Sequence, residues 1–418
     1  MSPEPLNGEN ERVVTREFVL VTITGIFALI GFSSTLPLVP RFVEGQLDGS
    51  KLDVGIAVGI FSISAVLARP LIGRLGDERG RRFIIVWGCG LTAVSVALHS
   101  VATSVEMLYA VRLAMGATQG AFFVGTATLV NDLAPPHRRA QATSYFSVAI
   151  YTGMAFGPLL GETVERQAGF TWAFIAGGVA LLLAAAAGTR LPVRVPSATP
   201  PASETASPHD EAATSVATGF GRLVHIEAIW PGVVLFCGIA AFTALNSFMP
   251  LYVEEWGLGT AGPVFVVYGL AVLVVRVAGA KLPDRWGTKR AAGLALVGQI
   301  AGLLVIGMFP STLGLYGGAL ILAVGGSMLY PALLTAAVHG VPTSQRAKAT
   351  STFSMAFELS AGVAGPALGL AASFGGNRAT FFAAAAFAAL GLPLLMRWAR
   401  ARPDRLVPPQ ASMAAASR

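Results

Sequence analysis

Among the charged side chains inside long apolar segments, where an isolated charge is costly, Glu358 and Arg112 are the two that could do chemistry. Glu358 lies about three helical turns beyond the basic residues Arg346 and Lys348. Hydrocarbon surroundings disfavour the charged form of a carboxyl group, so Glu358 could load and release protons near neutral pH. Arg112 must face a partner or a cavity if its segment spans a bilayer. Glu358 therefore suggests proton coupling, whereas Arg112 by itself requires only such a partner or cavity. The alternatives are a structural hydrogen bond or a cation contact for Glu358, and snorkelling to the nearby surface for Arg112.

Other kinds of chemical site have no matching pattern. Cys89 and Cys237 fall in apolar runs and suit neither a disulfide framework nor a metal cluster. The sequence has no ATP-binding loop, no zinc motif of the HExxH type and no nucleophile motif. We therefore predict no enzyme activity, no metal and no cofactor. The basic residues occupy short loops between apolar runs, which argues against nucleic acid as a partner.

The composition points to lipid as the solvent. Hydrophobic residues make up 54% of the 418 and charged residues 12%, whereas soluble domains carry about 25% charged residues. A bilayer core needs roughly 20 apolar residues per helix. We predict an all-α membrane protein with twelve spans, near 18–40, 54–74, 83–103, 106–130, 141–161, 170–189, 229–251, 262–282, 290–309, 313–338, 349–371 and 379–397.

The longest polar stretch divides the spans into two sets of six. It is rich in Pro, Ser, Ala and Thr, cannot bury a core, and is predicted to be a flexible linker. The predicted domains are an N-terminal tail (1–16), a six-helix bundle (17–190), the linker (191–227), a second six-helix bundle (228–398) and a C-terminal tail (399–418).

The distribution of basic residues predicts the orientation. With the N-terminus inside, 22 of the 29 Lys and Arg residues fall in inner segments, four in outer loops and three within spans. Because basic residues accumulate on the cytoplasmic side, both termini are predicted to be cytoplasmic, in a multi-pass protein of the cell membrane.

The two halves of the chain repeat each other. RAQATSYFSVA at 139–149 matches RAKATSTFSMA at 346–356, an offset of 207. The same offset aligns Arg69 with Arg276, Asp77 with Asp284, and Gly80 with Gly287. Weaker echoes pair PRFVEGQL at 40–47 with PLYVEEWG at 250–257, and GPLLG at 157–161 with GPALG at 365–369. Repeats of this kind commonly place a substrate site between the halves, near the membrane midplane.

The loop after the second span is a charged turn, Gly73-Arg-Leu-Gly-Asp77-Glu-Arg-Gly80-Arg81-Arg82. Its glycine supplies unusual backbone angles, and Asp77 can pair with an arginine or with a helix N-terminus. The spacing resembles the signature of the major facilitator superfamily. This sequence departs from that signature at Glu78, where the family usually has a basic residue. The resemblance implies a twelve-helix bundle of two pseudo-symmetric halves.

The same resemblance implies gating roles. In that family the loop aspartate contacts the eleventh helix, and a loop arginine pairs with an acid at the end of the fourth, where Asp132 stands. A degenerate second copy at 280–290 has Ala280 in place of the first glycine. The predicted gating residues are Gly73, Asp77, Gly80, Arg81, Arg82, Asp132, Asp284, Arg285 and Gly287.

Two further segments resemble motifs of the proton-coupled and drug-exporting members. Arg112 is followed by Gly116 and Gly120 at four-residue spacing, as in proton-coupled members where the arginine tunes a protonatable group. The fifth span has the kinked, closely packing pattern of drug–proton antiporters, carried by Gly153, Gly157, Pro158 and Gly161. Three features count against the drug-export assignment. Glu162 replaces the usual final glycine, and the glycine pattern partly recurs in the eleventh span. The first span also lacks the acid that several drug antiporters have there.

The leading prediction is proton-coupled export of small amphipathic molecules by a monomeric antiporter of the multidrug-resistance type. The alternatives are a permease for sugars or other polar metabolites, a membrane enzyme, and a non-transporting sensor. Side chains expected to contact the substrate are Gln119, Phe122, Tyr151, Asn246 and Tyr330. His99 and His339 lie near span ends and are expected at the membrane interface.

Overall fold

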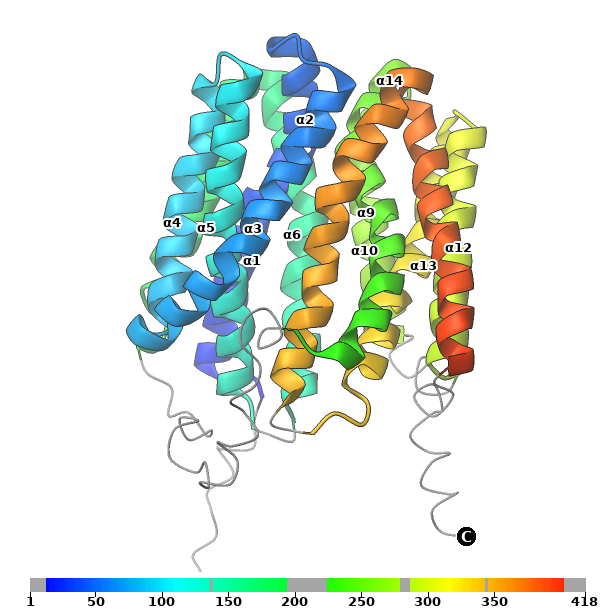
Figure 1. Ribbon diagram of the computed structural model, residues 1–418. Coiled ribbons are helices and arrows are strands. Elements are labelled where there is room, and N and C mark those ends of the chain that lie inside the picture. Colours follow the sequence, from blue (N-terminus) through cyan, green and yellow to red (C-terminus); the bar gives the residue numbers. More distant parts are fainter. Residues whose placement is uncertain (1–12, 136–137, 194–223, 279–285, 343–344, 402–418) are drawn as a thin grey trace, which may run out of the picture. The chain divides into compact units, whose positions relative to one another are not determined.

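The computed structural model describes residues 13–135, 138–193, 224–278, 286–342 and 345–401, which are almost entirely helical and contain no β-strand (Figure 1). The first half of the chain forms α1 (Arg16–Ser33), α2 (Thr35–Gln46), α3 (Lys51–Arg79), α4 (Arg81–Leu98), α5 (Val105–Leu133), α6 (Arg139–Ala168) and α7 (Phe170–Gly188). The second half forms α9 (Ile229–Glu255), α10 (Gly262–Ala278), α12 (Thr288–Met308), α13 (Thr312–Val338) and α14 (Arg346–Ala401).

These helices account for the twelve predicted spans. Within the described residues, nine helical segments are long and apolar enough to cross a membrane, and α1 with α2 counts as one of them. Helix α10 is shorter, and α6 is not among the nine although it has 30 residues. Helix α14 is two helices joined at Gly375 and Gly376, whose backbone angles are not helical. The predicted fold class is confirmed.

The break between α1 and α2 has a local cause. Pro37 has no N–H to give to the carbonyl group four residues earlier. Just before it, the hydroxyl groups of Ser34 and Thr35 donate to the carbonyl oxygens of Gly31 and Phe32, both at 2.8 Å. Such side-chain bonds compete with the helical ladder and bend helices. The first span is therefore interrupted near its middle.

The repeat offset of 207 recurs in the backbone. Gly169 separates α6 from α7 with φ 86° and ψ 174°, and Gly376 divides α14 with φ 71° and ψ 179°. Ser104 caps α5 through a 3.2 Å bond from the Met107 N–H, and Ser311 caps α13 with the same distance from the Gly314 N–H. Equivalent positions in the two halves thus begin and end helices in the same way.

The chain forms two compact units. Unit 1 comprises Met1–Leu38 and Ser64–Glu204, and unit 2 comprises Val39–Ile63 and Thr205–Arg418. Most of α2 and the first part of α3 therefore pack within unit 2. The predicted linker at 191–227 lies largely outside the described residues, so the predicted domain boundaries remain predictions.

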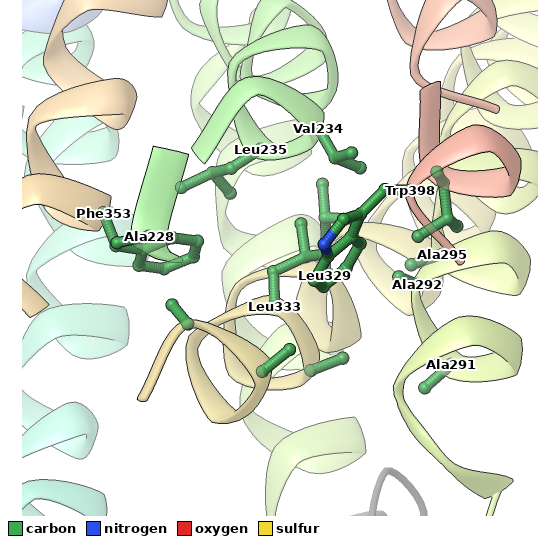
Figure 2. Packing of buried hydrophobic residues seen from close by; sticks show 14 of the residues in the cluster. Ala228, Val234, Leu235, Ala291, Ala292, Ala295, Leu329, Leu333, Phe353 and Trp398 are labelled. Atoms are coloured by element: carbon green, nitrogen blue, oxygen red, sulfur yellow. The ribbon is translucent and has the colours of Figure 1, made fainter. Parts of the chain in front are cut away.

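The core of unit 2 is built from small residues around a few large ones. Trp398 of α14 lies against Leu329 and Leu333 of α13 and beside Ala292 and Ala295 of α12 (Figure 2). Alanine and glycine allow helix backbones to approach closely, which is how membrane helices gain contact area without a hydrophobic driving force. This packing holds α9, α12, α13 and α14 in one bundle.

Candidate functional site: charged clusters and buried polar residues

The predicted gate motif forms a cluster at the end of α3. Gly80, with φ 90° and ψ 160°, separates α3 from α4. The Arg81 guanidinium lies between two carboxylates: Nη1 is 2.7 Å from Asp77 Oδ1, and Nε is 3.6 Å from Asp132 Oδ2 at the end of α5. We call Asp77, Arg81 and Asp132 the turn cluster. It joins the ends of three helices of unit 1, and its gating role remains a prediction.

The other residues of the two motif copies are placed less specifically. Gly73 has open space around it, whereas a methyl group on Gly76 would come within 2.9 Å of Ile84 Cδ1. The Arg82 side chain is half-buried. In the second copy, Asp284 and Arg285 lie outside the described residues. Gly287 is described and has φ 74° and ψ 157°, close to the angles of Gly80.

The predicted coupling arginine is buried in unit 1. Arg112 is 5% exposed, and its Nη1 lies 3.8 Å from the Met115 sulfur. Gln119 and Phe122, predicted to touch substrate, are 7% and 3% exposed on the same helix. Tyr151 on α6 is half-buried. An arginine buried among membrane helices is expected to face a partner or a cavity, so Arg112 and Gln119 mark α5 as a helix with buried polar side chains.

The glycines of the predicted antiporter motif face α1. A methyl group on Gly157 would come within 2.7 Å of the Ile30 carbonyl oxygen and of Ser33 Cβ. Substituents on Gly153 and Gly161 would collide with Leu29 and with the Ser34 backbone. Pro158 lies inside α6 in the same stretch. The motif therefore provides a close contact between α6 and α1 within unit 1.

Unit 2 contains the remaining predicted residues. Tyr330 Oη lies 3.0 Å from Ser354 Oγ, which links α13 to α14. Asn246 is 5% exposed and donates from Nδ2 to the Phe242 carbonyl oxygen at 2.8 Å. The Phe242 ring lies 5.6 Å from that of Phe357, measured between centroids. Glu358 follows directly and is half-buried.

A second acid is more buried than Glu358, and the sequence analysis noted it only as a departure from the antiporter motif. Glu162 is 5% exposed, and α6 continues past it to Ala168, beyond the predicted end of the fifth span. Its Oε1 lies 3.9 Å from Arg166 Nη2, one turn later. The signal that could have located it is the unusual acid in place of the motif's last glycine.

A cluster in unit 2 was also missed. Arg41 Nε bonds Glu254 Oε2 at 3.0 Å, and Lys51 Nζ lies 3.6 Å from Glu255 Oε2. The same Glu255 oxygen accepts from Asn377, at 3.1 Å from the backbone N–H and 2.6 Å from Nδ2. We call these five residues the end cluster. It ties α2, α3, α9 and α14 together. The available signal was the similarity of 40–47 to 250–257, since each segment contributes one side of the Arg41–Glu254 pair.

The end cluster stands beside a close contact of glycines. A methyl group on Gly365 of α14 would come within 2.6 Å of the Gly55 carbonyl oxygen in α3. One on Gly369 would approach the Lys51 carbonyl oxygen equally closely. The glycine pattern shared by α6 and α14 thus packs against α1 in unit 1 and against α3 in unit 2.

Comparison with known proteins agrees with this architecture. The family model described as Major Facilitator Superfamily matches residues 21–315 and 256–416. An uncharacterised MFS-type transporter of Salmonella typhimurium is 28% identical over 365 residues, covering 85% of this chain and 89% of its own. One from Burkholderia mallei is 26% identical over 396 residues, with 91% of each chain covered.

Solved structures give the same fold at lower identity. The nucleoside transporter NupG superposes with a TM-score of 0.73 at 12% identity, over 91% of this chain and 99% of its own. The human organic anion transporter MFSD10 superposes with a TM-score of 0.65 at 21% identity, over 91% of this chain and 100% of its own. At these identities the likeness extends to the fold alone.

Proposed function

This chain belongs to the major facilitator superfamily and is a membrane transporter of small molecules, and on that premise we propose that it exports amphipathic molecules in exchange for protons. The cycle is alternating access, in which the two halves rock around a central site. We further propose a monomer in the cell membrane with both termini in the cytoplasm, as the basic residues predict.

The observation that carries the export proposal is the contact between α6 and α1. Gly153, Gly157 and Gly161 all lie on the face of α6 that meets α1, and each position excludes a larger side chain. A helix pair this close has little room to slide or open, and Pro158 removes one backbone hydrogen bond from its middle. The close packing supports the function that the antiporter motif suggests, which is resistance of α6 and α1 to leakage during exchange.

Proton coupling is supported by two charged residues within the membrane helices. Arg112 is almost completely buried in unit 1, and Glu358 is half-buried in unit 2. We assign proton loading to Glu358 and electrostatic control to Arg112. The turn cluster, with the corresponding second copy, would guard the cytoplasmic side.

Transport of a polar metabolite is the second candidate, and one feature of unit 2 favours it. The hydroxyl pair of Tyr330 and Ser354, together with the buried amide of Asn246 on α9, offers uncharged hydrogen-bonding groups. Such groups suit sugars, nucleosides or peptides better than lipophilic cations. A substrate panel therefore has to include both chemical classes.

The test is a flux measurement in liposomes that contain the purified protein and a trapped pH-sensitive dye. Ethidium and tetraphenylphosphonium represent amphipathic compounds, and uridine, glucose and dialanine represent polar ones. We expect an amphipathic compound to move against the direction of proton movement. Substrate and protons moving in the same direction would overturn the export proposal, and flux of a polar compound alone would favour the second candidate.

Glu358→Gln provides the matched variant, since it keeps the size of the side chain and removes its charge. We expect this variant to bind the transported compound, but its proton-driven flux should be at least 10-fold lower than that of the wild type, because no carboxylate remains to take up the proton. Glu227→Gln, in the short turn Ile226–Ala228 that precedes α9 and before the predicted span 229–251, serves as the control. Unchanged coupling in Glu358→Gln would remove Glu358 from the mechanism.

A further inference from the structure

His99 is a buried titratable residue in unit 1 that none of the motifs includes. It is 0% exposed. It begins η2 (His99–Val101), the short 3-10 turn that follows α4. Its Nδ1 atom is 2.8 Å from the Ser95 carbonyl oxygen. A carbonyl oxygen only accepts, so Nδ1 carries the hydrogen and Nε2 of the neutral ring keeps a lone pair.

The surroundings of Nε2 leave that lone pair unused. Within the described part of the chain the atom is buried and has no hydrogen-bond partner. From α7 the ring meets Phe174, at 5.2 Å between ring centroids, which offers no polar group. From α5 the charged group that acts on it is Arg112. Buried polar atoms without a partner are rare and call for an explanation.

Resting on the proposed proton coupling, we propose that His99 Nε2 is a second protonation site, and that the charge of Arg112 controls when it is filled. The step moves one proton from a hydronium ion to the Nε2 lone pair and leaves water, with no change in oxidation state. The imidazolium that forms stands in the field of the Arg112 guanidinium. Two like charges in a poorly solvated site repel each other, so protonation favours a state in which Arg112 has moved away from His99.

His99 lies in a turn that reaches the protein surface at the end of α4. Val101, two residues along the same turn, is 54% exposed. The proposal requires that an opening of η2 admit water to Nε2. Arg112 lies on the adjoining helix, so a proton that enters here is sensed directly by the residue to which we assign electrostatic control.

A purely structural histidine is the competing explanation, and nitrogen NMR of the labelled imidazole rings in lipid bilayers separates the two without any substrate. The signal lost in His99→Asn belongs to this ring, and asparagine retains a donor for the Ser95 carbonyl group. We expect a neutral ring with hydrogen on Nδ1 at pH 8. Conversion to imidazolium should occur at a clearly higher pH in Arg112→Gln than in wild type or Arg112→Lys. Identical titration in all three proteins, or a ring that stays neutral to pH 4.5 in all of them, overturns the proposal.

Flux measurements with the compound selected from the panel add a second readout. In His99→Asn the rate of substrate-driven proton movement should fall at least 10-fold, while the variant still binds the compound. The control His339→Asn should behave as wild type. Full coupling in His99→Asn overturns this inference and leaves the proposed function standing. Absence of proton movement in the wild type defeats the proposed function instead, and the NMR titration then still decides whether His99 is a protonation site.

Discussion

The turn cluster and the end cluster both join helix ends through charged side chains, yet they are built differently. In the turn cluster Arg81 reaches Asp77 only four residues away, and the Asp77 side chain is 72% exposed. In the end cluster Arg41 reaches Glu254 across 213 residues. Glu255, with a side chain 36% exposed, receives three contacts from two other helices. The Asp77–Arg81 pair is therefore local and has a well solvated acid, whereas the contacts of Glu255 are long-range and partly buried.

The difference suggests different roles. Solvated ion pairs contribute about 0–1 kcal/mol and can break and re-form readily, which suits a group that must change partners during a transport cycle. The end cluster is supported by the glycine contact of α3 with α14, where backbones touch. Because the backbones of α3 and α14 touch there, we expect this contact to break only when the two helices separate. We therefore expect substitutions near the end cluster to change stability and those in the turn cluster to change rates.

The largest expected effect is on the glycine contact beside the end cluster. Gly365→Leu places a branched side chain at a position where even a methyl group would come within 2.6 Å of the Gly55 carbonyl oxygen. Overpacking of this kind costs about 1–3 kcal/mol, and we expect a clear fall in the midpoint of thermal unfolding in detergent. Gly317→Leu on α13, with nothing near its Cβ position, should leave the midpoint almost unchanged. Equal midpoints for the two variants would show that α3 and α14 are not held together here.

The next effect concerns the turn itself. Gly80 and Gly287 adopt positive φ, 90° and 74°, with extended ψ. Side chains at such angles cost about 1–3 kcal/mol, so Gly80→Ala and Gly287→Ala should each lower thermal stability. Gly73→Ala, in a helix with open space beside it, should instead raise stability by about 0.5–1 kcal/mol. Stabilisation by alanine at position 80 would contradict the backbone described for this turn.

A smaller effect separates the two acids of the end cluster. Glu255→Gln removes the charge that Lys51 and Asn377 share, and hydrogen bonds to charged groups contribute about 1.5–3 kcal/mol when intact. We expect a loss of about 1 kcal/mol in the free energy of unfolding, because the amide still accepts one bond. Glu254→Gln breaks a pair whose acid is 64% exposed, and it should cost about 0.5 kcal/mol or less. The reverse order would mean that Arg41, and not Lys51, anchors the cluster.

Local patterns in the sequence were sufficient for the fold and for the Asp77–Arg81 pair of the turn cluster. Apolar segments of membrane length predict spans directly, and the offset of 207 predicts that Gly80 and Gly287 form equivalent turns. Asp77 and Arg81 are one helical turn apart, so their pairing follows from spacing alone. Asp132 is distant in sequence and was located only through the resemblance to a family.

The end cluster, Glu162 and His99 show where local patterns fail. The partners of Arg41 and Glu255 are separated by more than 100 residues and belong to different spans, so only the packing of α2, α9 and α14 brings them together. Glu162 and His99 stand near predicted span ends, where an error of a few residues exchanges an exposed side chain for a buried one. Burial depends on neighbouring helices, which hydropathy along one helix does not describe.

The smallest expected change in stability is in the turn cluster, where the rate of transport should respond instead. Asp77→Asn removes the charge opposite Arg81 in a pair that is largely solvated, so the free energy of unfolding should change by no more than about 0.5 kcal/mol. If the aspartate gates the cycle, turnover of the selected compound should fall about 10-fold, a change of about 1.4 kcal/mol in the barrier. Its dissociation constant should stay within about twofold, because no substrate contact is lost. Glu78→Gln, which changes the neighbouring acid, is the matched control and should retain wild-type turnover. A loss of affinity at unchanged turnover in Asp77→Asn would make this aspartate a binding residue, and the contrast between the two clusters would then be one of position alone.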